Sequence, residues 1–109
     1  MLIRIWKVNV ENDKIADLKI FAETESLPMF KKQKGCLGVF FTLYGNQCAT
    51  ITLWKDMESI NALNSSAFYN ETVEKIEASG ILEGEHFVEI FNSFGGFLET
   101  DKINKFLQP

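Results

Sequence analysis

Two neighbouring strand-like runs, residues 36–44 and 47–55, carry apolar side chains on both of their faces. Side chains alternate between the two faces of a strand, so a sheet with one face in water shows alternating apolar and polar residues. Away from the ends of each run, one row is wholly apolar, and the opposite row is mixed but uncharged. The wholly apolar rows are Leu37, Val39, Phe41 and Leu43 in the first run and Ala49, Ile51 and Leu53 in the second. Both faces of this hairpin therefore need a cover that excludes water.

The loop between the two runs contains Gly45-Asn46, a pair that favours a hairpin turn less strongly than Asn-Gly does. The two wholly apolar rows share one face only if the loop holds an odd number of residues, such as three. An even loop would place each apolar row opposite a mixed one. We therefore expect an odd loop and one uniformly apolar face.

Before the hairpin, the sequence predicts one strand and one interrupted helix. Residues 2–10 are rich in Ile and Val and too short for a convincing helix, so they predict a strand. A helix capped by Asn12 or Asp13 follows. Pro28 is expected to interrupt this helix, because proline lacks a backbone donor and moves the residue before it out of helical geometry. A short second turn can restart at Pro28 and end near Gly35.

After the hairpin, the sequence predicts two helices and a last strand. Asp56 is suited to cap the first helix, and Ser65 or Ser66 the second. Ser79-Gly80 ends the second helix, because glycine readily adopts the backbone conformation that follows a helix C-terminus. Residues 86–94 form the predicted last strand.

The resulting order of strand, helix, strand, strand, helices and strand is the split βαβ order of a ferredoxin-like α+β fold. Such a fold has a four-stranded antiparallel sheet with helices over one face. We place this domain at residues 1–94 and a C-terminal tail at residues 95–109. The tail is expected to form one amphipathic turn or two, with the apolar residues Ile103, Phe106 and Leu107.

One layer of helices covers only one face of such a sheet, and the other face is apolar as well. The last strand repeats the pattern, with Val88 and Ile90 on one side and Phe87 and Phe91 on the other. The simplest cover is the sheet of a second copy, so the sequence predicts a homodimer that packs sheet to sheet. The alternative is a monomer whose C-terminal tail folds over the second face.

Charge and hydropathy exclude several classes of partner. The net charge is −4, and the one basic cluster, Lys31-Lys32 with Lys34, is too small to bind nucleic acid. The longest largely apolar stretch, residues 36–44, is under half the roughly 20 residues that cross a bilayer as a helix. Arg4 and Lys7 interrupt the apolar N-terminal residues, so no signal peptide is predicted. We expect a cytoplasmic protein without a membrane or nucleic-acid partner.

Few residues are suited to strong acid–base or metal chemistry. The single histidine, His86, cannot build a site of several histidines, and no Cys/His spacing matches a zinc pattern. Cys36 and Cys48 are expected to be free thiols, because hairpin pairing places them roughly 23–27 Å apart at the rise of a strand. No glycine-rich phosphate loop is present, so we expect neither a metal nor another cofactor.

Aromatic and weakly polar side chains gather on one face of the predicted sheet. They suit a mostly apolar cavity in which a few hydrogen-bonding groups orient a small apolar or aromatic ligand. The alternative is a core that packs solid, with the hydroxyl groups serving as partners of the tryptophan N–H. The candidate ligand-binding residues are Arg4, Trp6, Thr50, Thr52, Trp54, Phe68 and Tyr69.

Several short motifs in residues 1–94 resemble the antibiotic biosynthesis monooxygenase family. They are Arg4-Ile5-Trp6, Pro28-x-Phe30, Gln33-Lys34-Gly35, Ile51-Thr52-Leu53-Trp54-Lys55-Asp56, Ser66-Ala67-Phe68-Tyr69, Gly80-x-Leu82-x-Gly84 and Val88-Glu89-Ile90-Phe91. The resemblance implies a dimeric α/β barrel in which two sheets pack together and each ligand cleft lies between sheet and helices. It also implies that the face carrying Trp54 looks toward the helices and that the wholly apolar rows form the dimer core.

The resemblance further implies an activity. Some members of the family oxygenate aromatic polyketides or quinols with dioxygen and without metal or flavin. A haem-degrading branch uses an Asn in the first strand, a Trp matched here by Trp54, and a His on the next helix. Residues 56–79 contain no histidine, so haem degradation is not expected. The predicted function is cofactor-independent oxygenation of a small aromatic or quinol-like compound. The alternative is a non-catalytic dimeric module that binds a small apolar ligand.

Overall fold

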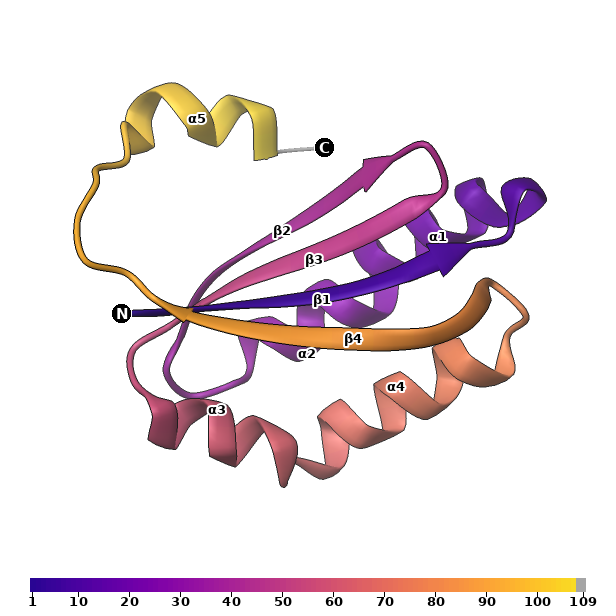
Figure 1. The fold of residues 1–109 in the computed structure, drawn as a ribbon, viewed down its shortest axis with the longest axis horizontal. Helices are drawn as coiled ribbons and strands as arrows, with labels where there is room; N and C mark the ends of the chain where they lie inside the picture. The colour runs from indigo at the N-terminus through magenta and orange to yellow at the C-terminus, as the bar shows by residue number, and fades with distance from the viewer. Residues whose placement is uncertain (108–109) are drawn as a thin grey trace.

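The structure is a computed structural model that describes residues 1–107, so the last two residues of the predicted tail lie outside the described part. The sheet is four-stranded and antiparallel with the strand order β2-β3-β1-β4, and Figure 1 shows the helices of residues 15–31 and 57–78 gathered on one side of it. In chain order the elements are β1 (Leu2–Val10), a 3₁₀ turn (Asn12–Lys14), α1 (Ile15–Phe21), a π-helix (Ala22–Ser26), α2 (Leu27–Lys31), β2 (Cys36–Tyr44), β3 (Gln47–Trp54), α3 (Met57–Asn64), α4 (Ala67–Ala78), β4 (Leu82–Asn92) and α5 (Thr100–Leu107). The predicted ferredoxin-like α+β fold is confirmed. No helix within residues 1–107 has the length and apolar character needed to cross a membrane.

Alternate residues of the two central strands are buried against the helices. These are the even-numbered residues of both strands, from Leu2 to Val10 in β1 and from Cys48 to Trp54 in β3. They pack against Leu18 of α1, Ile60 of α3 and Ile76 of α4. The face that carries Trp54 therefore looks toward the helices, as the family resemblance implied.

The hairpin turn has two residues, and the predicted odd loop is wrong. Tyr44 pairs with Gln47, and Phe41 pairs with Thr50. Val39, Phe41 and Leu43 of the β2 apolar row therefore lie on the helix side, paired with the mixed row of β3. Leu37 stands at a bulge between Cys36 and Gly38 and is 58% exposed. Only the apolar row of β3 faces the open side of the sheet, so the prediction that both apolar rows form one uniform face is corrected. Gly45 takes a φ of +61°, which lets a two-residue turn close despite the weaker Gly-Asn order.

Pro28 does not interrupt the helical region, contrary to the prediction. Leu27 keeps right-handed helical angles, φ −59° and ψ −50°, and its backbone N–H donates to the carbonyl of Ala22. That bond spans five residues and belongs to the π-helix that precedes Pro28. Because the chain widens into a π-turn here, Pro28 stands in the first turn of α2, where its missing donor is not needed.

The last strand begins at Leu82, four residues before the predicted start, and ends at Asn92. Its first residues pair with the end of β1, where Val10 lies opposite Leu82. The register then shifts between Lys7 and Asn9, and Gly84 has a φ of +79°. This bulge inserts extra residues into β4 and breaks the alternation of its side chains between the two faces. The sequence pattern therefore did not reveal the early start of the strand.

The caps of α3 and α4 agree with the sequence prediction. Asp56 accepts hydrogen bonds from the Ser59 hydroxyl (2.6 Å) and the Ser59 backbone N–H (2.8 Å), which hold the pKa of Asp56 below its ordinary value. Ser66 accepts from the backbone N–H of Tyr69 at the start of α4. Both caps satisfy N–H groups that a helix leaves unpaired at its N-terminus.

The C-terminal tail leaves the end of β4, and α5 lies apart from α1–α4 (Figure 1). The one or two amphipathic turns predicted for the tail form as the helix α5, but none of its residues is buried. Phe94 and Phe97 are also exposed, as are Phe87 and Phe91 on the open face of the sheet. The monomeric alternative requires the tail to cover that face. In the single chain the aromatic side chains of the tail leave it exposed.

Candidate functional site

Neighbouring positions of β1 and β3 place four of the predicted site residues together. Arg4 pairs with Thr52, and Trp6 pairs with Thr50. Paired residues point to the same side of a sheet, and these four point toward the helices. All four are buried, with Arg4 only 4% exposed.

A chain of hydrogen bonds links these strands to α4. The Trp54 indole N–H donates to the Thr52 hydroxyl (2.7 Å), and that hydroxyl donates to the backbone carbonyl of Arg4 (3.3 Å). The Arg4 guanidinium donates through Nη2 to the Tyr69 hydroxyl (2.8 Å), and its carbon lies 5.4 Å from the centre of the Tyr69 ring. These bonds fix the position of the Arg4 side chain against α4.

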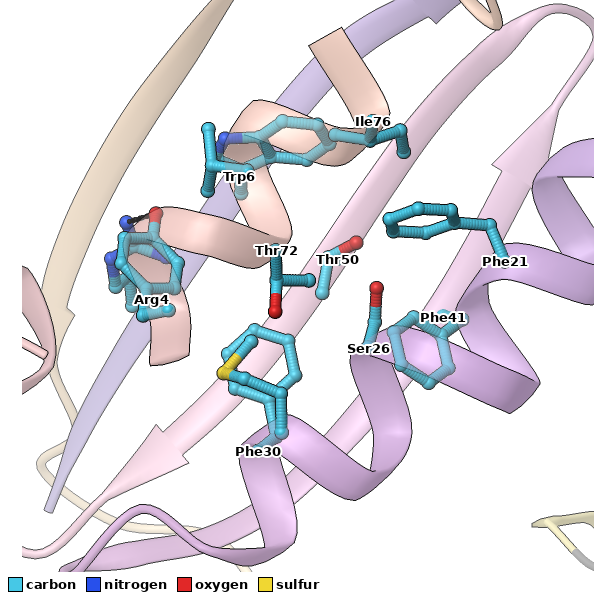
Figure 2. Close-up of a pocket in the computed structure, with 12 residues that line it drawn as sticks. Arg4, Trp6, Phe21, Ser26, Phe30, Phe41, Thr50, Thr72 and Ile76 are labelled. Atoms are coloured by element: carbon cyan, nitrogen blue, oxygen red, sulfur yellow. Dashed lines mark hydrogen bonds between the residues drawn. The ribbon is translucent and has the colours of Figure 1, made fainter. Parts of the chain in front are cut away.

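A cavity of about 50 Å³ lies between the sheet and the helices. Four predicted residues line it: Arg4, Trp6, Thr50 and Tyr69. Figure 2 shows Arg4 at one end, Phe21 and Phe41 at the other, and the hydroxyls of Thr50 and Thr72 between Trp6 and Phe30. The wall is mostly apolar with a few polar groups, the composition expected of a small-molecule site. The remaining lining residues are Phe21, Ser26, Met29, Phe30, Phe41, Thr72, Val73 and Ile76.

A second cavity, of about 100 Å³, adjoins the first. A water molecule occupies at least about 10–15 Å³ of such space, so the first cavity alone holds only a few waters or a very small ligand. A compound with several rings needs both cavities and a displacement of the aromatic side chains between them. The residues that line both cavities are Trp6, Phe21, Ser26, Phe41 and Thr50.

Three predicted site residues do not line either cavity. Trp54 is 0% exposed and packs in the core with Met29 and Ile60, and Thr52 is equally buried as its hydrogen-bond partner. Phe68 lies on the surface of α4, where the ammonium group of Lys32 is 5.8 Å from its ring centre. Trp54 therefore packs the sheet against the helices and does not contribute to the wall of either cavity.

Sequence reasoning missed the contribution of the helical region before β2. Phe21 directly precedes the π-helix and Ser26 is its last residue, and no local pattern in the sequence predicted that turn. Phe41 was missed for a different reason, because the predicted odd loop placed it on the other face of the sheet. The even register of Gly45-Asn46 would have identified it.

The remaining reactive groups lie outside the cavity wall or are unsuited to acid–base work. His86 stacks on Trp6 with ring centres 5.3 Å apart but does not line the first cavity. Cys36 and Cys48 are free thiols, as predicted, and burial raises the pKa of both. Residues 1–107 contain no cluster of three His, Cys, Asp or Glu side chains arranged to hold a metal ion.

No protein-family model matches the chain, and no curated protein matches it in sequence. Its fold matches that of a monooxygenase of Streptomyces coelicolor, ActVA-Orf6, solved in complex with nanaomycin D. The TM-score is 0.78 at 13% identity, over 89% of this chain and 90% of the other. A structure named antibiotic biosynthesis monooxygenase matches with a TM-score of 0.68 at 15% identity, over 87% and 100% of the two chains. A Nitrosomonas europaea protein of unknown function matches with a TM-score of 0.74 at 13% identity, over 89% and 92%.

These likenesses establish the fold. The chain has the architecture shared by structures named antibiotic biosynthesis monooxygenases, which agrees with the family resemblance of its sequence motifs. Its identity to each of them is too low to carry over a substrate or a set of catalytic residues.

Proposed function

We propose that this chain is a monooxygenase that oxidises a small aromatic or quinol-like compound without a cofactor. The observation that carries the proposal is the cavity between sheet and helices, whose aromatic wall includes the buried donors Arg4, Trp6 and Tyr69. The likeness in fold to a monooxygenase solved with nanaomycin D supports the same reaction class.

The reaction balances without an external reductant when the substrate is a fused-ring phenol. The hydroxyl group and the ring carbon opposite it each lose one hydrogen. That carbon gains one oxygen atom from dioxygen. The second oxygen atom leaves with the two hydrogens as water, so a naphthol gives a naphthoquinone. The electrons come from the aromatic substrate, which is oxidised as dioxygen is reduced.

The protein would contribute orientation and stabilisation of negative charge. A phenol that ionises in solution gives its proton to water and enters the cavity as an oxygen anion, and preorganised donors stabilise such a charge strongly. Arg4 supplies a permanent positive charge, and the hydrogen bond from Arg4 to Tyr69 fixes its orientation. The aromatic wall excludes water and holds the rings of the substrate.

The chain offers a matched pair of variants, because it contains only two tyrosines. Tyr69→Phe removes the partner that orients Arg4, and we expect it to lower the rate of oxygen uptake with naphthols by about tenfold. Tyr44 is 91% exposed on β2, so Tyr44→Phe is expected to leave the rate unchanged. The measurement is oxygen consumption together with mass spectrometry of the product formed under ¹⁸O₂. Equal effects of the two variants, or a product without the label, would contradict the proposal.

A second function is favoured by one specific feature of the cavity. None of the residues that line the first cavity is a histidine, aspartate or glutamate, so it contains no acid–base pair. A non-catalytic module that stores or carries a small apolar ligand needs none. Such a module would be stabilised by the naphthols through mass action but would consume no oxygen with any of them.

We also propose that the working form is a homodimer that packs sheet to sheet through the open face of β1, β3 and β4. Phe91 is 51% exposed on that face, opposite Ile3 and near Ile5 and Ile51. Phe87 is 68% exposed there, opposite Lys7, whose ammonium group is paired with Glu89. An exposed apolar surface of this kind, on a sheet that helices already cover on the other side, is typical of an interface between copies. The exposed aromatic residues of the tail are available to extend the same interface.

The dimer makes a direct prediction for molecular mass. Light scattering at micromolar concentration should give about twice the chain mass of 12.4 kDa. Phe87→Lys places a charge in the proposed interface and should give the monomer mass at the same concentration. Met57→Lys changes an apolar residue of α3 that is 46% exposed on the other side of the sheet, and it should leave the dimer intact. A monomeric unmodified chain would disprove the proposal.

A further inference from the structure

Arg4 carries a buried positive charge that no carboxylate balances in residues 1–107. It is 4% exposed, and its guanidinium donates a hydrogen bond only to the neutral hydroxyl of Tyr69. The ion pairs of the described part of the chain all involve lysines, at Lys7, Lys14 and Lys75. Arginine stays ionised in proteins, and buried charges are normally paired. The guanidinium therefore has no anionic partner within the described residues.

A second buried donor lies beside Arg4 and is also unpaired. The indole Nε1 of Trp6 is buried and has no hydrogen-bond partner in the described part of the chain. Trp6 follows Arg4 by two residues on β1, so both side chains point to the same side of the sheet, and both line the same cavity. A buried N–H without a partner is unfavourable, and native proteins retain few such groups.

The charges around the two cavities have one sign. Among all residues that line them, only Arg4 and Lys19 are charged, and no aspartate or glutamate contributes to either wall. The other polar groups that line the first cavity are hydroxyls, from Ser26, Thr50, Thr72 and Tyr69. A low-dielectric site with only positive charge favours an anion over a neutral molecule and excludes a cation.

We propose that the cavity selects a flat apolar ligand that carries an anionic oxygen, a carboxylate or an ionised phenol, held by Arg4 and by the N–H of Trp6. The rings of the ligand extend past Phe41 toward the second cavity. This inference rests on the proposed function in using the same cavity, and it adds the charge of the ligand. The binding itself requires no reaction.

The test measures binding by calorimetry in the absence of oxygen, with probes that differ in charge. 1-Naphthoate supplies a carboxylate, 4-nitro-1-naphthol supplies a phenol that ionises easily, 1-naphthamide is neutral, and 1-naphthylmethylamine is a cation. We expect at least one of the two anions to bind about ten- to hundredfold more tightly than the amide, because hydrogen bonds to charged groups are the stronger ones. The cation should not bind measurably. The anion that binds shows whether the anionic oxygen of the ligand belongs to a carboxylate or to an ionised phenol. An amide that binds as well as both anions would overturn the inference.

Variants show which groups make the selection. Arg4→Met should abolish the preference for the anion, and Arg4→Lys should keep part of it. Lys31→Met removes an exposed charge from α2 and serves as the control with an unchanged preference. Trp6→Phe keeps an aromatic ring but removes the N–H, and it should weaken the binding of 1-naphthoate several-fold. This variant keeps the test decisive even if Arg4→Met fails to fold, because full affinity without the N–H would remove Trp6 from the site.

The outcome is separable from the proposed reaction. A preference for the anions without oxygen consumption would support the inference and favour the binding module over the monooxygenase. Oxygen consumption with neutral compounds, together with no preference for anions in binding, would support the monooxygenase and contradict the inference.

Discussion

Replacing Trp54 with alanine is expected to lower the free energy of unfolding by about 3–5 kcal/mol. The side chain is fully buried between the sheet and α3, in a cluster with Leu2, Phe30 and Leu63. The substitution removes the largest of the fully buried side chains and leaves a cavity that its neighbours cannot fill. The loss is a large fraction of the roughly 5–15 kcal/mol that stabilises a domain. Urea unfolding at one fixed protein concentration measures it.

Trp54→Phe separates packing from hydrogen bonding. It keeps most of the apolar volume but removes the N–H that donates to Thr52 over 2.7 Å. We expect a smaller loss, about 1–2 kcal/mol, which is typical of one buried hydrogen bond. A loss below 1 kcal/mol for the alanine variant would show that Trp54 is not a packing residue and would reopen its assignment to a ligand site.

Gly35→Ala is expected to destabilise the protein by about 3 kcal/mol, for two separate reasons. Gly35 has a φ of +86°, which any residue with a Cβ adopts only with strain. An added Cβ would also lie 2.0 Å from the Ser59 hydroxyl oxygen. That hydroxyl donates to the capping carboxylate of Asp56, so relief of the clash disturbs the start of α3.

Two further variants isolate these contributions. Gly45 has a φ of +61° but nothing within 4 Å of an added Cβ, so Gly45→Ala should cost only about 1–2 kcal/mol of conformational strain. Introducing Gly35→Ala into a Ser59→Gly background should cost about as little, because the clashing side chain is gone. The difference between backgrounds is the coupling energy of the pair, measured by urea unfolding. Equal losses for Gly35→Ala in both backgrounds would show that the close approach to Ser59 is not what requires glycine.

These two positions also guide the choice of functional variants. Trp54 was a candidate site residue by sequence, yet a rate measured on Trp54→Ala would mainly report a loosened core. Tyr69 and Tyr44 make the better pair, because each change to phenylalanine removes one oxygen atom and leaves the ring. Arg4 and Trp6 report on the ligand itself, since both line the cavity.

The sequence by itself determined the features that depend on neighbours along the chain. Strand β1 follows from its β-branched residues, and the starts of α3 and α4 follow from Asp56 and Ser66, whose side chains bond the N–H groups three residues on. Arg4, Trp6 and Thr50 were predicted to share a face, because side-chain direction repeats every two residues in a strand.

Only the tertiary structure decided the features that depend on contacts distant in sequence. A change of one residue in the turn at Gly45-Asn46 moves Phe41 from one face of the sheet to the other, so local pattern could not place it. The π-helix before Pro28 and the bulge in β4 are adjustments of the chain to the packing around them. The hairpin with two apolar faces thus predicted that both sides of the sheet need cover. The packing of the helices decided that the row with Phe41 contributes to the cavity wall and that the row with Ile51 faces the open side.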